Sequence, residues 1–271
     1  MRKKCLLIIT GALATALLFS SCFSLGGSFN PLSGIEQAAS NRISAEIISA
    51  TGLNGMSKKL QFQVLYAQVF YMGGFGAGTY PLEETQGTTW RIKSTDENGT
   101  ASSVDAERAL LKKLPNGDEW WFLAWRSGGD NIEFEGLMDK DQQAKKIRYY
   151  NQDTGRIEET VFDEPSKSSS SSDNAAPKEP ASGALTQDEL GTISKGKETV
   201  TVNSGTYTAD RMEWTKKDDS NNATYTYTWW VDQTAPGGLV KYNWVKSGSK
   251  ENIAGELYST KKGYTTKFSS F

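Results

Sequence analysis

The sequence contains no histidine, and only two cysteines occur among its 271 residues. Without an imidazole side chain, Cys–His and Ser–His nucleophiles cannot form, and the usual zinc and copper sites lose a ligand that they need. Cys5 precedes an apolar segment that we expect to be removed, which leaves Cys22 as the only thiol and excludes an internal disulfide. We therefore expect a non-enzymatic protein with no catalytic residue, no metal site and no cofactor.

Carboxylate pairs are the remaining candidates for acid–base chemistry, namely Glu83 with Glu84 and Glu133 with Glu135. Glycoside hydrolysis, for example, needs two such groups on opposite sides of a cleft. These acids lie in polar stretches with the pattern that is typical of a solvated face. The pattern therefore favours a structural role for them over a catalytic one.

Apolar runs long enough to cross a bilayer as a helix are also lacking at the N-terminus. The run from Leu6 to Phe19 has about 14 residues, whereas a spanning helix needs about 20. It follows the basic residues 2–4 and precedes the small residues Ser20 and Ser21, which is the order of parts in a secretory signal peptide. Residues 1–21 are therefore predicted to be a removed signal peptide.

Residues 19–22 read Phe-Ser-Ser-Cys and resemble the lipobox of bacterial lipoproteins, with phenylalanine where that pattern prefers leucine. The resemblance implies that Cys22 is lipidated and that residues 22–30 are a flexible tether to a membrane. Two or three acyl chains anchor stably, because each buried methylene contributes about 0.8 kcal/mol. Phe23 is not the aspartate that resembles an inner-membrane retention signal, which favours the outer membrane of a bacterial cell envelope. An ordinary secretory signal is the alternative.

Positive charge is scarce in the expected mature chain. Removing residues 1–21 takes away three of the 30 basic residues and none of the 32 acidic ones, so the net charge falls to −5. Nucleic-acid binding rewards clustered lysine and arginine, so we expect no nucleic-acid partner.

Two segments early in the mature chain show helical spacing. Residues 33–36 fit a capping box and Thr51-Gly52 supplies a stop, so residues 34–50 are predicted to be a helix. Residues 58–72 alternate at first as a strand would, but their apolar residues then continue at helical steps. Their glutamines and alanine favour a second helix over a strand.

The rest of the chain alternates apolar and polar residues with the period of two that strands show. Asn116-Gly117 and Asp153-Thr154-Gly155 predict hairpin turns, because these residues tolerate positive φ. The last residues, 267–271, are expected to close an edge of the sheet. Strands are expected at residues 89–92, 107–114, 120–126, 132–138, 145–150, 157–162, 198–202, 206–214, 224–231, 239–245 and 254–259.

A segment of different composition divides the strands into two groups. It includes a run of five serines, so residues 163–187 are predicted to be a disordered loop rich in serine, proline and alanine. Residues 31–162 are expected to hold a helix and a first β-meander, and residues 188–271 a second meander. A small sheet with one apolar face exposed is not stable alone, so the two meanders should share one core.

A tryptophan doublet occurs twice, each time followed six residues later by a glycine pair. The two copies are Trp120-Trp121 with Gly128-Gly129 and Trp229-Trp230 with Gly237-Gly238. They predict two similar meanders, and hence an α+β, mainly antiparallel β fold. We expect a curved sheet or half-barrel with one or two N-terminal helices packed against it.

Four aromatic residues are candidate ligand-binding residues: Trp121 and Trp125 share one strand face, and Tyr227 and Trp229 share another. Their rings either fill the core or line a cavity on the concave side of the sheet. The leading hypothesis is an envelope lipoprotein whose concavity binds an apolar ligand, such as a lipid or the acyl group of a lipoprotein. The alternative is a structural or surface-interaction lipoprotein with a filled core.

Two resemblances accompany these patterns. The second half resembles a β-rich module of bacterial envelope proteins, which implies an antiparallel sheet. More loosely, the architecture is similar to that of the periplasmic lipoprotein carriers of the LolA type, which bind acyl chains. The residues that carry the first resemblance are Thr199–Val202, Gly205–Tyr207, Trp229–Val231, Ala235–Tyr242 and Glu256–Leu257.

Overall fold

The structure, a computed structural model, describes residues 58–70, 72–74, 81–128, 130–140, 143–162, 193–218, 223–268 and 271. All of these residues belong to one compact structural unit, Gly34–Phe271. Several expected features lie outside the described residues: the signal peptide at 1–21, the tether at 22–30 with Cys22, the helix at 34–50 and the loop at 163–187.

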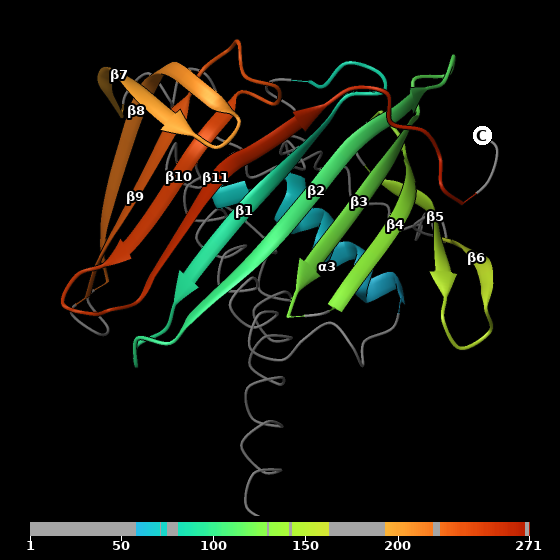
Figure 1. The fold of residues 1–271 in the computed structure, drawn as a ribbon, viewed down its shortest axis with the longest axis horizontal. Coiled ribbons are helices and arrows are strands. Elements are labelled where there is room, and N and C mark those ends of the chain that lie inside the picture. The colour runs from blue at the N-terminus through green and yellow to red at the C-terminus, as the bar shows by residue number, and fades with distance from the viewer. Residues whose placement is uncertain are drawn as a thin grey trace, which may run out of the picture. The chain divides into compact units, whose positions relative to one another are not determined.

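The described strands form one antiparallel sheet of eleven (Figure 1). Each strand range expected from the sequence overlaps one of them, so the period of two located the strands correctly. Their bounds are β1 (Gly87–Thr95), β2 (Ala101–Lys113), β3 (Glu119–Ser127), β4 (Asp130–Met138), β5 (Ala144–Asn151), β6 (Arg156–Val161), β7 (Ser194–Val202), β8 (Gly205–Asp218), β9 (Ala223–Val231), β10 (Leu239–Lys246) and β11 (Asn252–Lys261).

Across the sheet, the strand order is β6-β5-β4-β3-β2-β1-β11-β10-β9-β8-β7. Neighbours in the chain are therefore neighbours in the sheet except at its centre. There β1 pairs with β11, from Gly87 opposite Lys261 to Thr95 opposite Asn252. The edge strands β6 and β7 do not pair with each other in the described part of the chain, so this mainly antiparallel sheet is unclosed.

The β7 end of the sheet curls back toward the centre. The turn between β7 and β8 bonds to β11, where Asn203 Nδ2 donates to the Tyr258 carbonyl oxygen at 2.8 Å. The backbone N–H of Ser204 donates to the Leu257 carbonyl oxygen at 3.3 Å. Because β7 and β11 are four strands apart in the sheet order, these bonds require a strong curvature over β8, β9 and β10.

The ambiguous segment at 58–72 is a helix, α3 (Lys58–Phe70), followed by the 3₁₀ turn η1 (Met72–Gly74). Figure 1 shows α3 lying across one face of β1 to β4. Phe62, Leu65 and Val69 are buried, and this helical spacing overrides the earlier alternation. Phe62 sits over Gly136 of β4, where an added Cβ would lie 2.7 Å from its ring.

The two faces of the sheet carry different cores. We call the face that packs against α3 the inner face and the opposite one the outer face. The inner cluster joins buried residues of α3 with residues of both halves of the sheet, among them Trp121 and Trp229. The outer cluster is smaller and consists of residues on β2 and β3, including Trp120 and Phe122. Both faces of β3 are thus covered.

Candidate functional site

The inner face of β9 carries two aromatic rings, Tyr227 and Trp229, that stack on each other. Their centroids are 5.8 Å apart and their planes differ by 13°. Trp229 is 1% exposed, and its indole Nε1 donates to the Gly73 carbonyl oxygen of η1 at 2.5 Å. The ring centroid of Tyr227 also lies 5.3 Å from that of Trp214 and 6.4 Å from that of Trp244. These rings form an aromatic wall in the second half of the sheet and attach η1 to it.

Tyr242 of β10 extends this wall toward the first half because two glycines make room for its ring. An added Cβ would lie 2.4 Å from the ring at Gly73 and 2.1 Å from it at Gly255. The Tyr242 ring lies 5.9 Å from the ring of Trp90 on β1. The wall therefore crosses β11, where Gly255 carries no side chain that would interrupt it.

Trp121 and Trp125 lie on the inner face of β3, each 7% exposed. The Trp121 ring meets Phe70 of α3 edge to face at 4.9 Å. Its Nε1 donates to Glu119 Oε2 at 3.0 Å. All four predicted ligand residues thus belong to the inner core. The structure brings Tyr227 and Trp229 into contact, whereas Trp121 and Trp125 lie on a strand that five pairings separate from β9.

The two tryptophan doublets present opposite members to the inner face. On β3 the second residue, Trp121, points inward and Trp120 lies in the outer cluster. On β9 the first residue, Trp229, is fully buried inside, while Trp230 is partly buried. The indole of Trp230 donates to Glu198, and the Lys241 ammonium lies 4.9 Å from its ring centroid.

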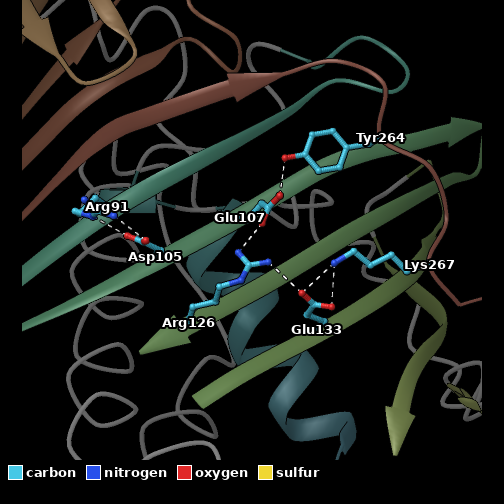
Figure 2. Close-up of polar contacts among 7 residues, drawn as sticks. All are labelled: Arg91, Asp105, Glu107, Arg126, Glu133, Tyr264 and Lys267. Atoms are coloured by element: carbon cyan, nitrogen blue, oxygen red, sulfur yellow. Dashed lines mark hydrogen bonds and ion pairs between the residues drawn. The ribbon is translucent and has the colours of Figure 1, made fainter. Parts of the chain in front are cut away.

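The C-terminal segment, residues 262–268, crosses the outer face instead of closing an edge of the sheet. Figure 2 shows two of its residues reaching β2 and β4. Tyr264 donates its hydroxyl to Glu107 Oε1 at 2.5 Å, and the Lys267 ammonium contacts both carboxylate oxygens of Glu133 at 3.1 Å. The expectation that residues 267–271 close an edge was wrong for the described part of this segment, because Lys267 bonds to Glu133 and Glu135 on the outer face of β4.

Arg126 of β3 joins these two contacts into one charged network (Figure 2). Its guanidinium donates to Glu107 at 2.5 Å and to Glu133 at 3.1 Å. Partial burial raises the pKa of Glu133, but the bonds from Lys267 and Arg126 outweigh it, so the pKa lies below its ordinary value. Burial and the bond to Glu107 raise the pKa of Tyr264. The network holds the C-terminal segment in place.

Glu135 was expected on a solvated face, and the structure shows it 0% exposed. It accepts hydrogen bonds from the Thr266 hydroxyl at 2.8 Å and the backbone N–H of Lys267 at 2.6 Å. The C-terminal segment buries this side chain, which the local sequence pattern could not reveal. Both glutamates of the pair thus bind the chain's own tail, and neither faces a cleft with an acid opposite.

The other candidate pair has structural contacts as well. Glu83 forms an exposed ion pair with Lys262 at 2.5 Å. Glu84 Oε2 accepts from the backbone N–H of Lys113 at 3.0 Å. Glu83 therefore links the loop before β1 to the C-terminal segment, and Glu84 links the same loop to β2.

A hollow of about 630 Å³ lies at the ends of β1 to β4 on the outer face. Its lining is polar and includes Arg91, Lys93, Asp105, Arg126 and Asn131. Arg91 is held by Asp105 through two bonds of 2.8 and 2.9 Å (Figure 2). Since its two arginines already have carboxylate partners, this hollow does not resemble the apolar cavity that the sequence predicts.

Two structural features are absent from the described residues. No helix among them is long and apolar enough to cross a membrane. No group of three or more cysteine, aspartate and glutamate side chains among them is placed to hold a metal ion.

Sequence reasoning did not single out Arg108 or Tyr264. Alternate residues of a strand point to the same face, so Arg108 shares the inner face of β2 with its apolar neighbours Val104, Ala106 and Leu110. This alternation in the sequence could have indicated a buried cation. No local pattern marks Tyr264, because its partners come from distant strands.

Comparison with models of known protein families finds no match, and comparison with curated protein sequences finds none either. Among solved structures, the chain is similar to a predicted lipoprotein of Parabacteroides distasonis. That likeness has 11% identity and a TM-score of 0.32, and it covers 67% of this chain and 97% of the other.

Two further solved structures are similar to this chain to about the same extent. A predicted exported protein of Bacteroides fragilis with a YmcC-like fold has 10% identity and a TM-score of 0.33, over 68% of this chain and 98% of that one. A predicted outer membrane lipoprotein-sorting domain of Vibrio parahaemolyticus has 9% identity and a TM-score of 0.27, over 67% and 86%. Likeness at this level does not establish a common function, so the proposals below rest on this chain's own residues.

Proposed function

We propose that this chain is a non-enzymatic lipoprotein of the bacterial cell envelope that binds an apolar ligand or an acyl chain at the inner face of its sheet. One observation carries the proposal. Aromatic rings run along the inner face from Trp121 on β3, past Trp90 and Tyr242, to Trp229 and Tyr227 on β9. The outer face instead carries charged pairs and the C-terminal segment.

An aromatic wall of this kind suits an acyl ligand. Flat rings offer a large apolar area, and apolar sites usually add a few polar groups that fix the orientation of the ligand. Trp121, Trp125, Tyr227 and Trp229 are the proposed contact residues. Trp125 and Trp229 lie in the first and second halves of the sheet, so a long chain bound along the wall would contact both halves.

The ligand proposal is tested on the full chain carrying Cys22→Ser, so that no attached acyl group contributes to the signal. Native mass spectrometry of protein purified from bacteria should show a co-purifying lipid, and a fluorescent fatty acid should bind and be displaced by unlabelled fatty acid. If neither is seen, the core is filled. The chain is then a structural or surface-interaction lipoprotein, as the alternative states.

The membrane anchor is proposed at Cys22, and the outer membrane is the proposed location. The support is the lipobox-like sequence together with the absence of an aspartate after the cysteine. In the native host, Cys22→Ser should move the protein from the membrane fraction to the soluble fraction. Continued membrane association would show that the anchor lies elsewhere.

We also propose that the two halves are similar meanders sharing one core, with the N-terminal helices completing an α+β fold. Each doublet lies on the third strand of its half, β3 among β1 to β6 and β9 among β7 to β11. If the core is shared, residues 188–271 expressed alone should not give a cooperative unfolding transition. An independently folding fragment would show that the second half has a core of its own.

A further inference from the structure

Two neighbouring residues of the inner face each bury a polar atom that has no hydrogen-bond partner in the described part of the chain. These atoms are Nε of Arg108 on β2 and Oγ1 of Thr88 on β1. The two residues stand directly opposite each other in the pairing of β1 with β2, so their side chains share one face. Buried polar groups without partners are rare in native structures, and each of them calls for an explanation such as a bound ligand.

The guanidinium of Arg108 has one edge engaged and one edge open. Its Nη1 donates to the Val69 carbonyl oxygen of α3 at 3.1 Å, and the Phe70 ring lies 5.6 Å away. No carboxylate pairs with Arg108 among the described residues. The remaining edge, formed by Nε and Nη2, is the edge through which arginine binds a carboxylate with two parallel hydrogen bonds.

The site carries a positive charge that is nearly sealed from water. Arg108 is 6% exposed and Thr88 is 0% exposed. Burial lowers the pKa of Arg108 to about 10, and neighbouring Tyr66 opposes that shift, so the guanidinium stays protonated at neutral pH. A buried cation without a counter-ion is costly, and a bound anion would remove much of that cost.

The turn between β9 and β10 lies directly against the guanidinium of Arg108. An added Cβ at Gly237, in the turn between β9 and β10, would lie 2.4 Å from Nη2 of Arg108. Gly237 also has a φ of +80°, which favours glycine. Glycine at this position therefore lets the turn pass next to Nη2 without placing a side chain on the guanidinium.

We infer that the apolar ligand is an acid: the carboxylate head of a fatty-acid-like molecule binds Nε and Nη2 of Arg108 and the hydroxyl of Thr88, and its chain lies along the aromatic wall. This inference rests on the proposed function, because it names the polar end of the same ligand. Both orphaned donors then have an acceptor, and the buried charge has its counter-ion.

The experiment compares two ligands of equal chain length, dodecanoate and dodecan-1-ol, by titration calorimetry with the full chain carrying Cys22→Ser. We expect dodecanoate to bind at least about tenfold more tightly at pH 7, since charged hydrogen bonds exceed neutral ones in strength. Equal affinity for the two overturns the inference and leaves the proposed function standing. Binding of neither ligand overturns both.

Variants then assign the preference to the two residues. Arg108→Met should bring the affinities for acid and alcohol to the same value while alcohol binding persists, and Thr88→Val should reduce the preference by a factor of about three. Arg108→Lys keeps the charge without the paired donors, so it should retain part of the preference even if Arg108→Met fails to fold. The matched control is Arg91→Met on the outer face of β1, which should leave the preference unchanged. A full preference for the acid in folded Arg108→Met overturns the inference.

Discussion

The two tryptophan doublets have the same sequence and different surroundings. Trp121 and Trp229 enter the inner core, although one is the second member of its doublet and the other is the first. The remaining members differ further. Trp120 is 3% exposed beneath the Arg148 guanidinium, 3.8 Å from its ring, whereas Trp230 is only partly buried.

Strand direction explains this reversal. β3 and β9 are separated by five antiparallel pairings, so they run in opposite directions. Both halves nevertheless progress across the sheet in the same sense, β7 to β11 and then β1 to β6. The second copy of the meander thus has strands of the opposite direction but adds them across the sheet in the same sense as the first. This is possible only if the inner and outer faces of the two copies are exchanged. A repeated sequence thus marks corresponding strands without marking corresponding faces.

The largest effect that we expect comes from Trp229→Ala. The ring is fully buried and its indole holds η1, so the free energy of unfolding should fall by about 3–5 kcal/mol. Trp230→Ala is the matched control and should cost about 1 kcal/mol, because that ring is partly exposed. Urea unfolding measures both. Equal losses would contradict the assignment of Trp229 as the fully buried member of this doublet and Trp230 as the partly exposed one.

Trp120→Ala should have the next largest effect, about 3 kcal/mol. It removes the ring beneath Arg148 and the contact with Phe271, whose ring centroid lies 6.1 Å away. If Trp120 behaved like its sequence counterpart Trp229, the substitution would also release η1. Hydrogen exchange of α3 separates the two cases, and we expect the exchange of α3 to stay unchanged.

Glu135→Gln should lower the free energy of unfolding by about 1–3 kcal/mol, because one acceptor of two buried hydrogen bonds becomes a donor. The C-terminal segment should loosen, so that acrylamide quenches Trp120 while Trp229 stays protected. Glu83→Gln removes only an exposed ion pair and is the control. Unchanged quenching in Glu135→Gln would mean that other contacts suffice to hold the segment.

The smallest expected effect is a dependence on pH in the same segment. The folded-state pKa of Glu133 lies below its ordinary value of 4.5, so its contribution is present above about pH 4.5 and is lost as the pH falls through the folded pKa. The stability difference between the wild type and Lys267→Met should therefore be constant from pH 7 to 5 and shrink below pH 4. Urea unfolding at several pH values measures it. A difference that grows in acid would contradict the sign of this shift.

The strands could be predicted from the sequence, and the arrangement of the faces only in part. A period of two located all eleven described strands. It also placed Trp121 with Trp125 on one strand face and Tyr227 with Trp229 on another. The helical character of 58–70 was favoured by composition and decided by packing against β2 and β3.

Long-range contacts account for what the sequence did not reveal. Glu135 looks like a surface acid in its own strand, and only the arrival of Thr266 and Lys267 buries it. The pairing of β1 with β11 is equally non-local, and no feature in the sequence of either strand identifies its partner. Arg108 could have been flagged from strand parity, but its lack of a counter-ion becomes visible only in three dimensions.

The central position of β1 and β11 has a consequence for the timing of folding. Of the described strands, the first to leave the ribosome pairs with the last, so a nascent chain that ends before residue 252 has β1 as an open edge. Closing so long a loop slows folding far more than it lowers stability, and an open edge can pair wrongly in the meantime. We therefore expect the complete sheet to form only after β11 has left the ribosome, in one late step that pairs β11 with β1.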